Sequence, residues 1–191
     1  MPGSGATKGG LVVISGPSGT GKTTICKRLA RMDPDIEFSV SATTRPSRPG
    51  EVDGKDYHFL TREEFARRIQ RGEFVEHAEY AGELYGTLKE PLERAIAAGR
   101  TMILDIDTQG AQQVLAAYPD AVTIFLEPPS FDELLRRLHG RNTDSPDKQQ
   151  RRIQIARREM ARRMDYRHRV VNDNLDKAVC QVYSIITGTR R

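Results

Sequence analysis

The sequence predicts an α/β fold in which helices flank a parallel β-sheet. The first observation is a set of short apolar segments, at residues 11–14, 102–107 and 121–126, with the composition of buried strands. The second is a set of helix-forming segments, such as 25–31 and 90–98, that stand between these strands. The third is a glycine-rich turn that directly joins the first strand to the first helix. Strands that alternate with helices in this way are typical of a parallel, helix-covered sheet.

The glycine-rich turn carries the full G-x-x-x-x-G-K-[ST] pattern of a phosphate loop. Its residues are Gly16, Pro17, Ser18, Gly19, Thr20, Gly21, Lys22 and Thr23, and Thr24, which follows them, is also expected to bind the nucleotide. Glycines let backbone amides converge on phosphate oxygens, and the helix that begins near Lys22 directs the positive end of its dipole at the same anion. Lys22 can reach the terminal phosphates, and the Thr23 hydroxyl can hold Mg²⁺. Because a strand precedes the turn and a helix follows it, a P-loop NTPase core is favoured over an accidental glycine-rich turn.

Length and charge limit the classes of protein to consider. The chain has 191 residues, which suits one compact domain with inserted subdomains. Its net charge is +4, but 30 basic and 26 acidic residues are interleaved, so no basic arm indicates a nucleic-acid partner. No segment has the length of a membrane span, and no signal peptide precedes the first strand. We expect a cytoplasmic protein with no membrane partner and with a mobile tail at residues 1–9.

The two cysteines, Cys26 and Cys180, are far apart and form no C-x-x-C pattern. This usage is typical of reduced thiols in the cytosol and supports the expected localisation. The four histidines are scattered without the spacing of metal ligands, so we interpret them as structural or surface residues.

Between the first helix and the next buried strand, the sequence predicts a strand-rich insertion. A short strand begins at Phe38 and opens into a loop, because proline and glycine at 46–50 exclude a helix. A second strand is expected at 57–60, followed by a capping box and a helix over 64–71. Residues 74–80 alternate at a period of two and can pair with 84–87 as a hairpin.

The second half of the chain contains an acidic strand end and an arginine-rich helical region. The strand at 102–107 contains Asp105, and an acid at a strand end is the second signature of a P-loop enzyme, where it helps to hold Mg²⁺. Helices are expected at 131–139, 146–165 and 175–187, with a short strand at 169–172. Most arginines of this region are interpreted as members of a solvated helix face.

A P-loop protein with spare arginines suits phosphoryl transfer, in which catalysis is mostly positioning and charge neutralisation. If the acceptor is itself a phosphate, it is already an anionic nucleophile at neutral pH. No catalytic serine, cysteine or histidine is then required.

Several motifs give the sequence a family resemblance. They are ISGPSGTGKT at 14–23, SVSATTRP at 39–46, GEVDGKDY at 50–57, LDIDTQG at 104–110 and VVND at 170–173. With them the chain resembles the guanylate kinases, P-loop enzymes that make GDP and ADP from GMP and ATP. The resemblance runs from Gly10 to the C-terminus, and the segment 41–57 is highly specific to this family.

The resemblance implies a division of the chain and two bound molecules. Residues 39–93 would be the GMP-binding subdomain and 131–157 a helical lid, while 1–38, 94–130 and 158–191 would form the core. ATP would be the phosphate donor, with Mg²⁺ held by Thr23 and Asp105. GMP would be the substrate, and the oligomeric state is left open.

The resemblance also implies roles for individual residues. Phosphate contacts fall to Arg45, Arg48, Tyr57 and Tyr85, in keeping with the fork geometry of arginine. Guanine contacts fall to Ser41, Glu76, Thr87 and Asp107, with both carboxylates accepting from guanine N–H groups. Lys22, Arg45, Arg48, Arg137, Arg141 and Arg152 would act in transfer, the last three from the lid and its flank. Asn172 and Asp173 would lie near adenine.

Three alternatives come from other classes. A guanylate-kinase-like interaction module without activity is disfavoured, because Lys22, Thr23, Asp105 and both loop arginines are present. A basic nucleic-acid-binding ATPase would show salt-dependent binding. A kinase for another monophosphate is disfavoured by Glu76 together with Asp107. His77 departs from the family, which often has an aromatic there, but on a strand its side chain should point away from Glu76.

Overall fold

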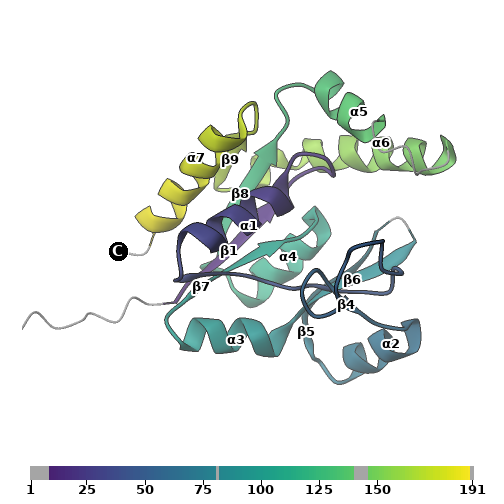
Figure 1. Cartoon of the computed structure of the whole chain (residues 1–191), viewed down its shortest axis with the longest axis vertical. Coiled ribbons are helices and arrows are strands. Elements are labelled where there is room, and N and C mark those ends of the chain that lie inside the picture. The colour runs from purple at the N-terminus through teal and green to yellow at the C-terminus, as the bar shows by residue number, and fades with distance from the viewer. Residues whose placement is uncertain (1–8, 81, 140–145, 190–191) are drawn as a thin grey trace, which may run out of the picture.

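A five-stranded parallel sheet forms the centre of the computed structural model, which describes residues 9–80, 82–139 and 146–189 (Figure 1). In spatial order its strands are β2 (Ile36–Phe38), β7 (Thr101–Asp105), β1 (Leu11–Ser15), β8 (Val122–Glu127) and β9 (His168–Val171). All five residues of β1 are buried, as expected for a central parallel strand that is covered on both faces. In the register of β1 with β7, Ile14 lies opposite Asp105.

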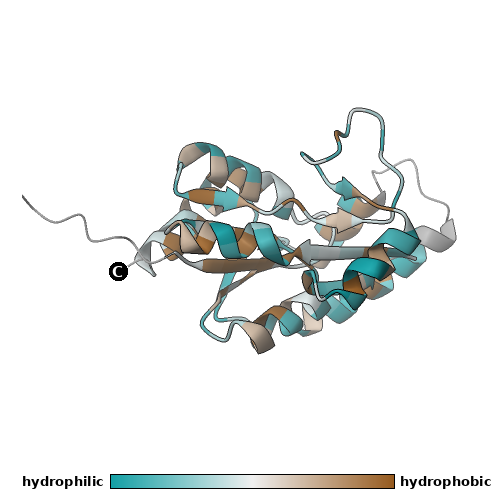
Figure 2. Cartoon of the chain, turned by 90° about the horizontal axis from the view of Figure 1, so that it is seen from below, coloured by the Kyte–Doolittle hydropathy of each residue, from teal (hydrophilic) through white to brown (hydrophobic). Residues whose placement is uncertain are grey.

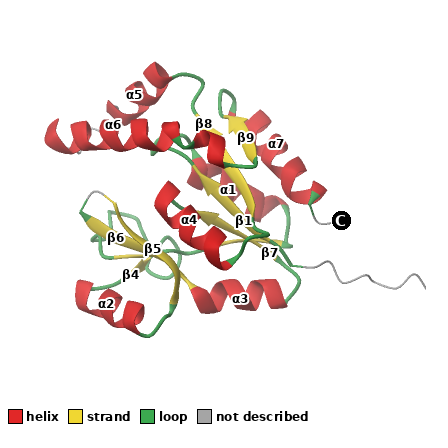
Figure 3. Cartoon of the chain, turned by 180° about the vertical axis from the view of Figure 1, so that it is seen from behind, coloured by secondary structure: helices red, strands yellow, loops and turns green. Residues whose placement is uncertain are grey.

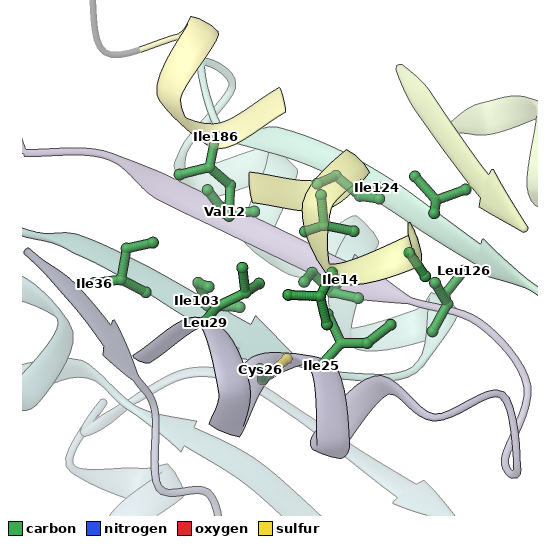
Figure 4. Close-up of a cluster of buried hydrophobic side chains, with 14 of the residues drawn as sticks. Val12, Ile14, Ile25, Cys26, Leu29, Ile36, Ile103, Ile124, Leu126 and Ile186 are labelled. Atoms are coloured by element: carbon green, nitrogen blue, oxygen red, sulfur yellow. The ribbon is translucent and has the colours of Figure 1, made fainter. Parts of the chain in front are cut away.

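Helices cover the two faces of this sheet with separate hydrophobic clusters. The even-numbered Val12 and Ile14 of β1 belong to a cluster with residues of α1 (Lys22–Met32) and α7 (Leu175–Gly188), as Figure 4 shows. The odd-numbered Leu11 and Val13 belong to a cluster with α3 (Lys89–Ala97) and α4 (Thr108–Ala117). Because successive side chains of a strand point to opposite faces, β1 alone anchors helices on both sides.

The insertion expected after the first helix forms a second sheet, separate from the central one (Figure 3). Its strands are, in spatial order, β4 (His58–Phe59), β3 (Ala42–Thr43), β6 (Glu83–Leu88) and β5 (Phe74–Tyr80). The predicted hairpin is confirmed: β5 and β6 are antiparallel, with Glu76 opposite Thr87. Between β4 and β5, α2 (Arg62–Gln70) begins at the predicted cap, where the Thr61 hydroxyl accepts from the Glu64 amide at 3.1 Å.

The region after β8 is helical, as predicted, and lies beside the phosphate loop. It contains α5 (Phe131–His139) and α6 (Pro146–Ala161), which pack through Leu134, Leu138 and Ala156.

In Figure 2 the central strands are mostly brown, whereas the surrounding helices mix teal and brown, as expected when helices bury only one face. None of the helices within the described residues is both long and apolar enough to cross a membrane.

Three details differ from the sequence-based expectations. The first is α4, which was not predicted; it begins directly after β7, where Asp107 caps its first turn. The second is the helix expected over 146–165, which ends at Ala161 and is followed by a 3₁₀ turn at Arg163–Asp165. The third is the strand that was expected to begin at Phe38. The observed strand, β2, begins at Ile36, ends at Phe38 and pairs with β7. Arg141 and, apart from Gly9, the proposed tail at 1–9 lie outside the described residues.

Candidate functional site

The phosphate loop joins β1 to α1 and depends on glycine at two positions. Gly16 has φ of +139°, and a Cβ there would lie 2.3 Å from the carbonyl oxygen of Leu126. Gly21, the N-cap of α1, has φ of +92°, and its Cβ would lie 2.6 Å from Nδ2 of Asn172. No acidic residue stands in the first turn of α1, and no side chain caps it. The amides at this helix end are therefore available for an anion such as a nucleotide phosphate.

Lys22 and Thr23 meet Asp105 because β1 and β7 are neighbours in the sheet. The Lys22 ammonium donates to the carbonyl oxygens of Gly16 at 2.6 Å and Pro17 at 3.2 Å, and lies 3.9 Å from Asp105 Oδ1. The Thr23 hydroxyl donates to Asp105 Oδ2 at 2.5 Å. A hydroxyl beside a carboxylate suits Mg²⁺, which is usually held by one or two protein oxygens together with substrate phosphates and water. The described residues contain no larger cluster of His, Cys, Asp or Glu that could hold a metal.

A cavity of about 360 Å³ extends from the phosphate loop to the second sheet. The predicted site residues that line it are Ser18, Gly19, Gly21, Lys22, Thr23, Thr24, Ser41, Arg45, Arg48, Tyr57, Glu76, Tyr85, Asp105, Asp107 and Arg152. The loop residues Gly16, Pro17 and Thr20 are not in its lining, and neither are Thr87, Arg137, Asn172 and Asp173. The tertiary structure thus brings residues from the loop, the insertion and α6 to one open cleft.

At the far end of the cavity, Glu76 is buried, with 5% of its surface exposed. Its Oε1 accepts a hydrogen bond of 2.7 Å from the hydroxyl of Thr87, which is fully buried. Thr87 therefore contacts Glu76 without lining the cavity itself. Burial raises the pKa of Glu76 to about 7, with a smaller contribution from the negative charge of Asp107. Oδ1 of Asp107 accepts from the amides of Gln109 at 2.9 Å and Gly110 at 2.7 Å, so this carboxylate is also the N-cap of α4.

Arg45 is held in place by an acid that the sequence analysis did not single out. Its guanidinium makes two hydrogen bonds of 2.9 Å to the carboxylate of Glu51 and lies 5.3 Å from the centre of the Tyr57 ring. Glu51 also accepts a hydrogen bond of 2.7 Å from the backbone amide of Arg48. One carboxylate therefore holds together the two parts of the loop that carry Arg45 and Arg48. The guanidinium of Arg45 holds the pKa of Glu51 below its usual range. The only signal in the sequence was the proximity of Glu51 to the two arginines.

Three tyrosines, two in strands of the second sheet and one directly before β4, line the cavity one after another. The rings of Tyr57 and Tyr85 meet edge to face with centres 6.2 Å apart, and Tyr85 meets Tyr80 in the same way at 6.5 Å. Tyr80, at the end of β5, was not predicted; it lines the same cavity as Ser18 of the phosphate loop. Burial raises the pKa of Tyr80, so it remains a neutral hydrogen-bonding group. A side chain of the insertion therefore faces the same cavity as the phosphate loop.

The helical region adds a buried arginine and a buried acid from α6. Arg152 and Glu159 are 8% and 5% exposed, whereas the neighbouring Arg151, Arg157 and Arg158 are exposed as expected. Burial raises the pKa of Glu159 to about 7, and its Oε2 has no hydrogen-bond partner within the described residues. Glu159 was missed because an acid within an arginine-rich helix resembles half of a surface ion pair.

The remaining predicted residues lie around the loop. Arg137 of α5 donates to Glu133 at 2.7 Å and lies beside Gly19, its Cβ 3.6 Å from the position of a Cβ on that glycine. Asn172 is buried, and its side-chain amide donates to the carbonyl oxygen of Thr20 at 2.8 Å, so it connects the end of β9 to the phosphate loop. Asp173 is exposed next to it.

Comparisons with known proteins place the chain in a family. The sequence model of the family described as "Guanylate kinase" matches residues 8–189. The guanylate kinase of Frankia casuarinae is 48% identical over 180 residues, covering 94% of this chain and 98% of the relative. The guanylate kinase of Symbiobacterium thermophilum is also 48% identical, over 96% of this chain and 87% of its own length.

Solved structures agree with these sequence matches. The crystal structure of guanylate kinase from Anaplasma phagocytophilum superposes with a TM-score of 0.81 and 33% identity, covering 96% of this chain and 87% of that one. Shikimate kinase from Bacteroides thetaiotaomicron has a TM-score of 0.51 at 17% identity, over 93% of this chain and 98% of its own, which reflects a shared fold. On the family match and these identities, the chain belongs to the guanylate kinase family of nucleoside-monophosphate kinases.

Proposed function

We propose that this protein transfers the γ-phosphoryl group of ATP to GMP in an Mg²⁺-dependent reaction, giving ADP and GDP. One observation carries the proposal: a single cavity joins Lys22 and Thr23 of the phosphate loop to the buried carboxylate of Glu76. The first end suits the phosphates of a nucleotide donor. The second end suits a base that presents N–H donors. Membership of the guanylate kinase family supports the same assignment.

The transfer step needs positioning more than proton chemistry. The phosphate of GMP has a second pKa near 6, so at neutral pH it attacks as an anion without a general base. Lys22 and the N-terminus of α1 stabilise charge on the transferring phosphoryl group. Thr23 and Asp105 would hold Mg²⁺, which neutralises charge on the donor phosphates when it is bound.

Arg45 and Arg48 are positioned to receive the phosphate of GMP. They lie on one loop that Glu51 organises, and both line the cavity. An arginine fork binds phosphate oxygens in a bidentate manner. Tyr57 and Tyr85 supply further hydroxyl donors from the adjoining strands, and Ser41 lines the cavity on the same side. These residues would set the acceptor phosphate in line with the donor.

Guanine is distinguished from adenine by its hydrogen-bond pattern. Guanine has donors at N1 and at its exocyclic amine, whereas adenine presents an acceptor at N1. Glu76 and Asp107 accept from guanine but would face a lone pair of adenine, which leaves the buried carboxylate of Glu76 unsatisfied. Recognition requires Glu76 to be ionised, and its raised pKa makes GMP binding weaken as the pH falls below about 7.

Closure of two regions completes the proposal. Residues 39–93 would act as the GMP-binding subdomain and 131–157 as a lid that carries Arg137, Arg141 and Arg152 to the phosphates. Both would move inward when the substrates bind, because water left at the transferring group would hydrolyse ATP. Asn172 and Asp173 would border the adenine of ATP.

A coupled ADP-release assay with GMP, AMP, dTMP and CMP tests the assignment. We expect turnover with GMP in the presence of Mg²⁺ and at least ~100-fold lower kcat/KM with AMP, because adenine would leave the buried carboxylate of Glu76 without a donor. Equal rates with several monophosphates would contradict the guanine-specific proposal. ATP hydrolysis that no monophosphate stimulates would contradict the kinase proposal as a whole.

A further inference from the structure

Helix α4 is fastened to strand β5 by one side chain. The amide group of Gln113 donates from Nε2 to the carbonyl oxygen of His77 at 2.8 Å, and its Oε1 accepts from the backbone amide of His77 at 3.2 Å. Gln113 thus occupies both backbone groups of His77 as a neighbouring strand would. Because His77 directly follows Glu76, these two bonds determine where Glu76 lies along α4.

The first turn of α4 also has room for the Glu76 carboxylate only because residue 110 is glycine. A Cβ at Gly110 would lie 2.4 Å from Oε2 and 3.0 Å from Cδ of Glu76. Its backbone has no positive φ, so alanine could adopt the same conformation. Glycine within a helix is unfavourable relative to alanine, so some other requirement must keep it there. In this structure that requirement is the carboxylate packed against its Cα.

We propose that Gly110 and Gln113 are positioning residues for guanine recognition. Gly110 leaves the space in which the Glu76 carboxylate lies, and Gln113 holds the strand that carries it. Together with the Thr87 hydroxyl on Oε1, they allow the carboxylate one position beside Asp107 at the end of the cavity. This inference rests on the proposed function, because it assumes that Glu76 reads the base.

The substitution Gly110→Ala tests the first half of the inference. The atom that must move is the end of a flexible side chain, so the fold should survive while the carboxylate is displaced. We expect the Kd for GMP, measured by calorimetry without ATP, to rise by about 10- to 100-fold. The Kd for ATP should not rise, and the Tm should not fall. Gly188→Ala is the matched control, because Gly188 also lies in a helix and nothing stands within 4 Å of its Cβ position.

A double substitution separates this role from a general structural effect. Once the carboxylate is removed by Glu76→Ala, a methyl group at 110 has nothing left to displace. Glu76→Ala with Gly110→Ala should therefore bind GMP no more weakly than Glu76→Ala alone. Additive losses in the double variant would overturn the role assigned to Gly110.

The substitution Gln113→Ala tests the second half. It removes both bonds to His77, and we expect the Kd for GMP to rise about 3- to 30-fold with the Kd for ATP unchanged. The adjacent Gln112→Ala is the control, since Gln112 is exposed and has no side-chain hydrogen bond within the described residues. Wild-type affinity for GMP in Gln113→Ala or in Gly110→Ala would overturn the inference for that residue. Failure of the wild-type protein itself to bind GMP would instead overturn the proposed function.

Discussion

The Thr23 hydroxyl donates a hydrogen bond of 2.5 Å to Oδ2 of Asp105, although 82 positions separate the two residues. The bond joins the first turn of α1 to the end of β7, and it exists because β1 and β7 are paired in parallel, with Ile14 opposite Asp105. The carboxyl ends of parallel strands lie at one edge of a sheet. The Thr23 hydroxyl and the Asp105 carboxylate therefore meet at that edge, beside the phosphate loop. This pair is therefore the natural place for the Mg²⁺ of the proposed reaction.

Replacement of Asp105 by asparagine should weaken the metal site. The amide oxygen keeps the shape but loses the negative charge that a hard cation prefers. We expect the Mg²⁺ concentration for half-maximal rate to rise about 10- to 100-fold. The measurement is a Mg²⁺ titration of the coupled assay, with Asp120→Asn as an exposed control. An unchanged titration midpoint would exclude Asp105 from the metal site.

Lys22→Ala should nearly abolish transfer while the fold remains intact. One preorganised donor to charge that develops in the transition state is typically worth about 10²–10³ in rate. Steady-state kinetics give the loss, and circular dichroism checks the fold. Lys177→Ala removes an equal charge from the exposed surface of α7 and should have no effect. A Lys22→Ala enzyme that retains half of the wild-type kcat would refute the role assigned to this lysine.

Glu76→Ala should reduce discrimination between GMP and AMP. A hydrogen bond to a charged partner contributes about 1.5–3 kcal/mol, so kcat/KM for GMP should fall by roughly 10- to 100-fold. The KM for ATP should barely change, because the site that we propose for ATP is formed by the phosphate loop. The ratio of kcat/KM values for GMP and AMP is the quantity to measure. If that ratio stays at the wild-type value, Glu76 is an ordinary buried residue of β5.

The pKa of Glu76 also predicts how stability depends on pH. Because burial raises this pKa from 4.5 to about 7, the stability linked to the neutral carboxyl is complete below about pH 4.5 and is lost as the pH rises through 7. Glu76→Gln cannot ionise and retains an acceptor for the Thr87 hydroxyl. We expect the variant to exceed the wild type in free energy of unfolding by about 1–3 kcal/mol at pH 8.

At pH 4 this advantage should be much smaller, because the wild-type carboxyl is then largely protonated in both the folded and the unfolded protein. Urea unfolding at the two pH values measures the difference. If the variant and the wild type differ in free energy of unfolding by the same amount at both pH values, the pKa of Glu76 is close to its ordinary value. Together with loss of guanine preference, a gain at pH 8 would identify Glu76 as a residue kept for recognition at the expense of stability.

Closure predicts a change in the dimensions of the molecule. Small-angle scattering should give a smaller radius of gyration with GMP and a non-hydrolysable ATP analogue than without nucleotides, if the proposed lid and GMP-binding subdomain move inward as we expect. Calorimetry on the same samples establishes that both sites are filled. A constant radius of gyration in the filled complex would contradict the motion.

Much of the fold could be predicted from the sequence because the signals are local. The G-x-x-x-x-G-K-[ST] spacing, the apolar run before it and the alternation at 74–80 each depend on neighbouring residues, and all three segments adopt the predicted structure. Helix α4 was missed although its cap, Asp107, was noted, because that residue was assigned to the substrate rather than to the helix. The Thr23 and Asp105 oxygens could be paired in advance, since parallel strands align their carboxyl ends.

Other features were decided by the tertiary structure alone. Alternation marks Glu76 as one polar residue of a strand, and only the docking of α4 on β5 buries it and raises its pKa. Likewise, neither the position of Tyr80 in the cavity lining nor the burial of Glu159 can be predicted from neighbouring residues in the sequence. The physical reason is that desolvation and close packing depend on residues distant in the chain. The requirement for glycine at 110 is set by the carboxylate that lies against it.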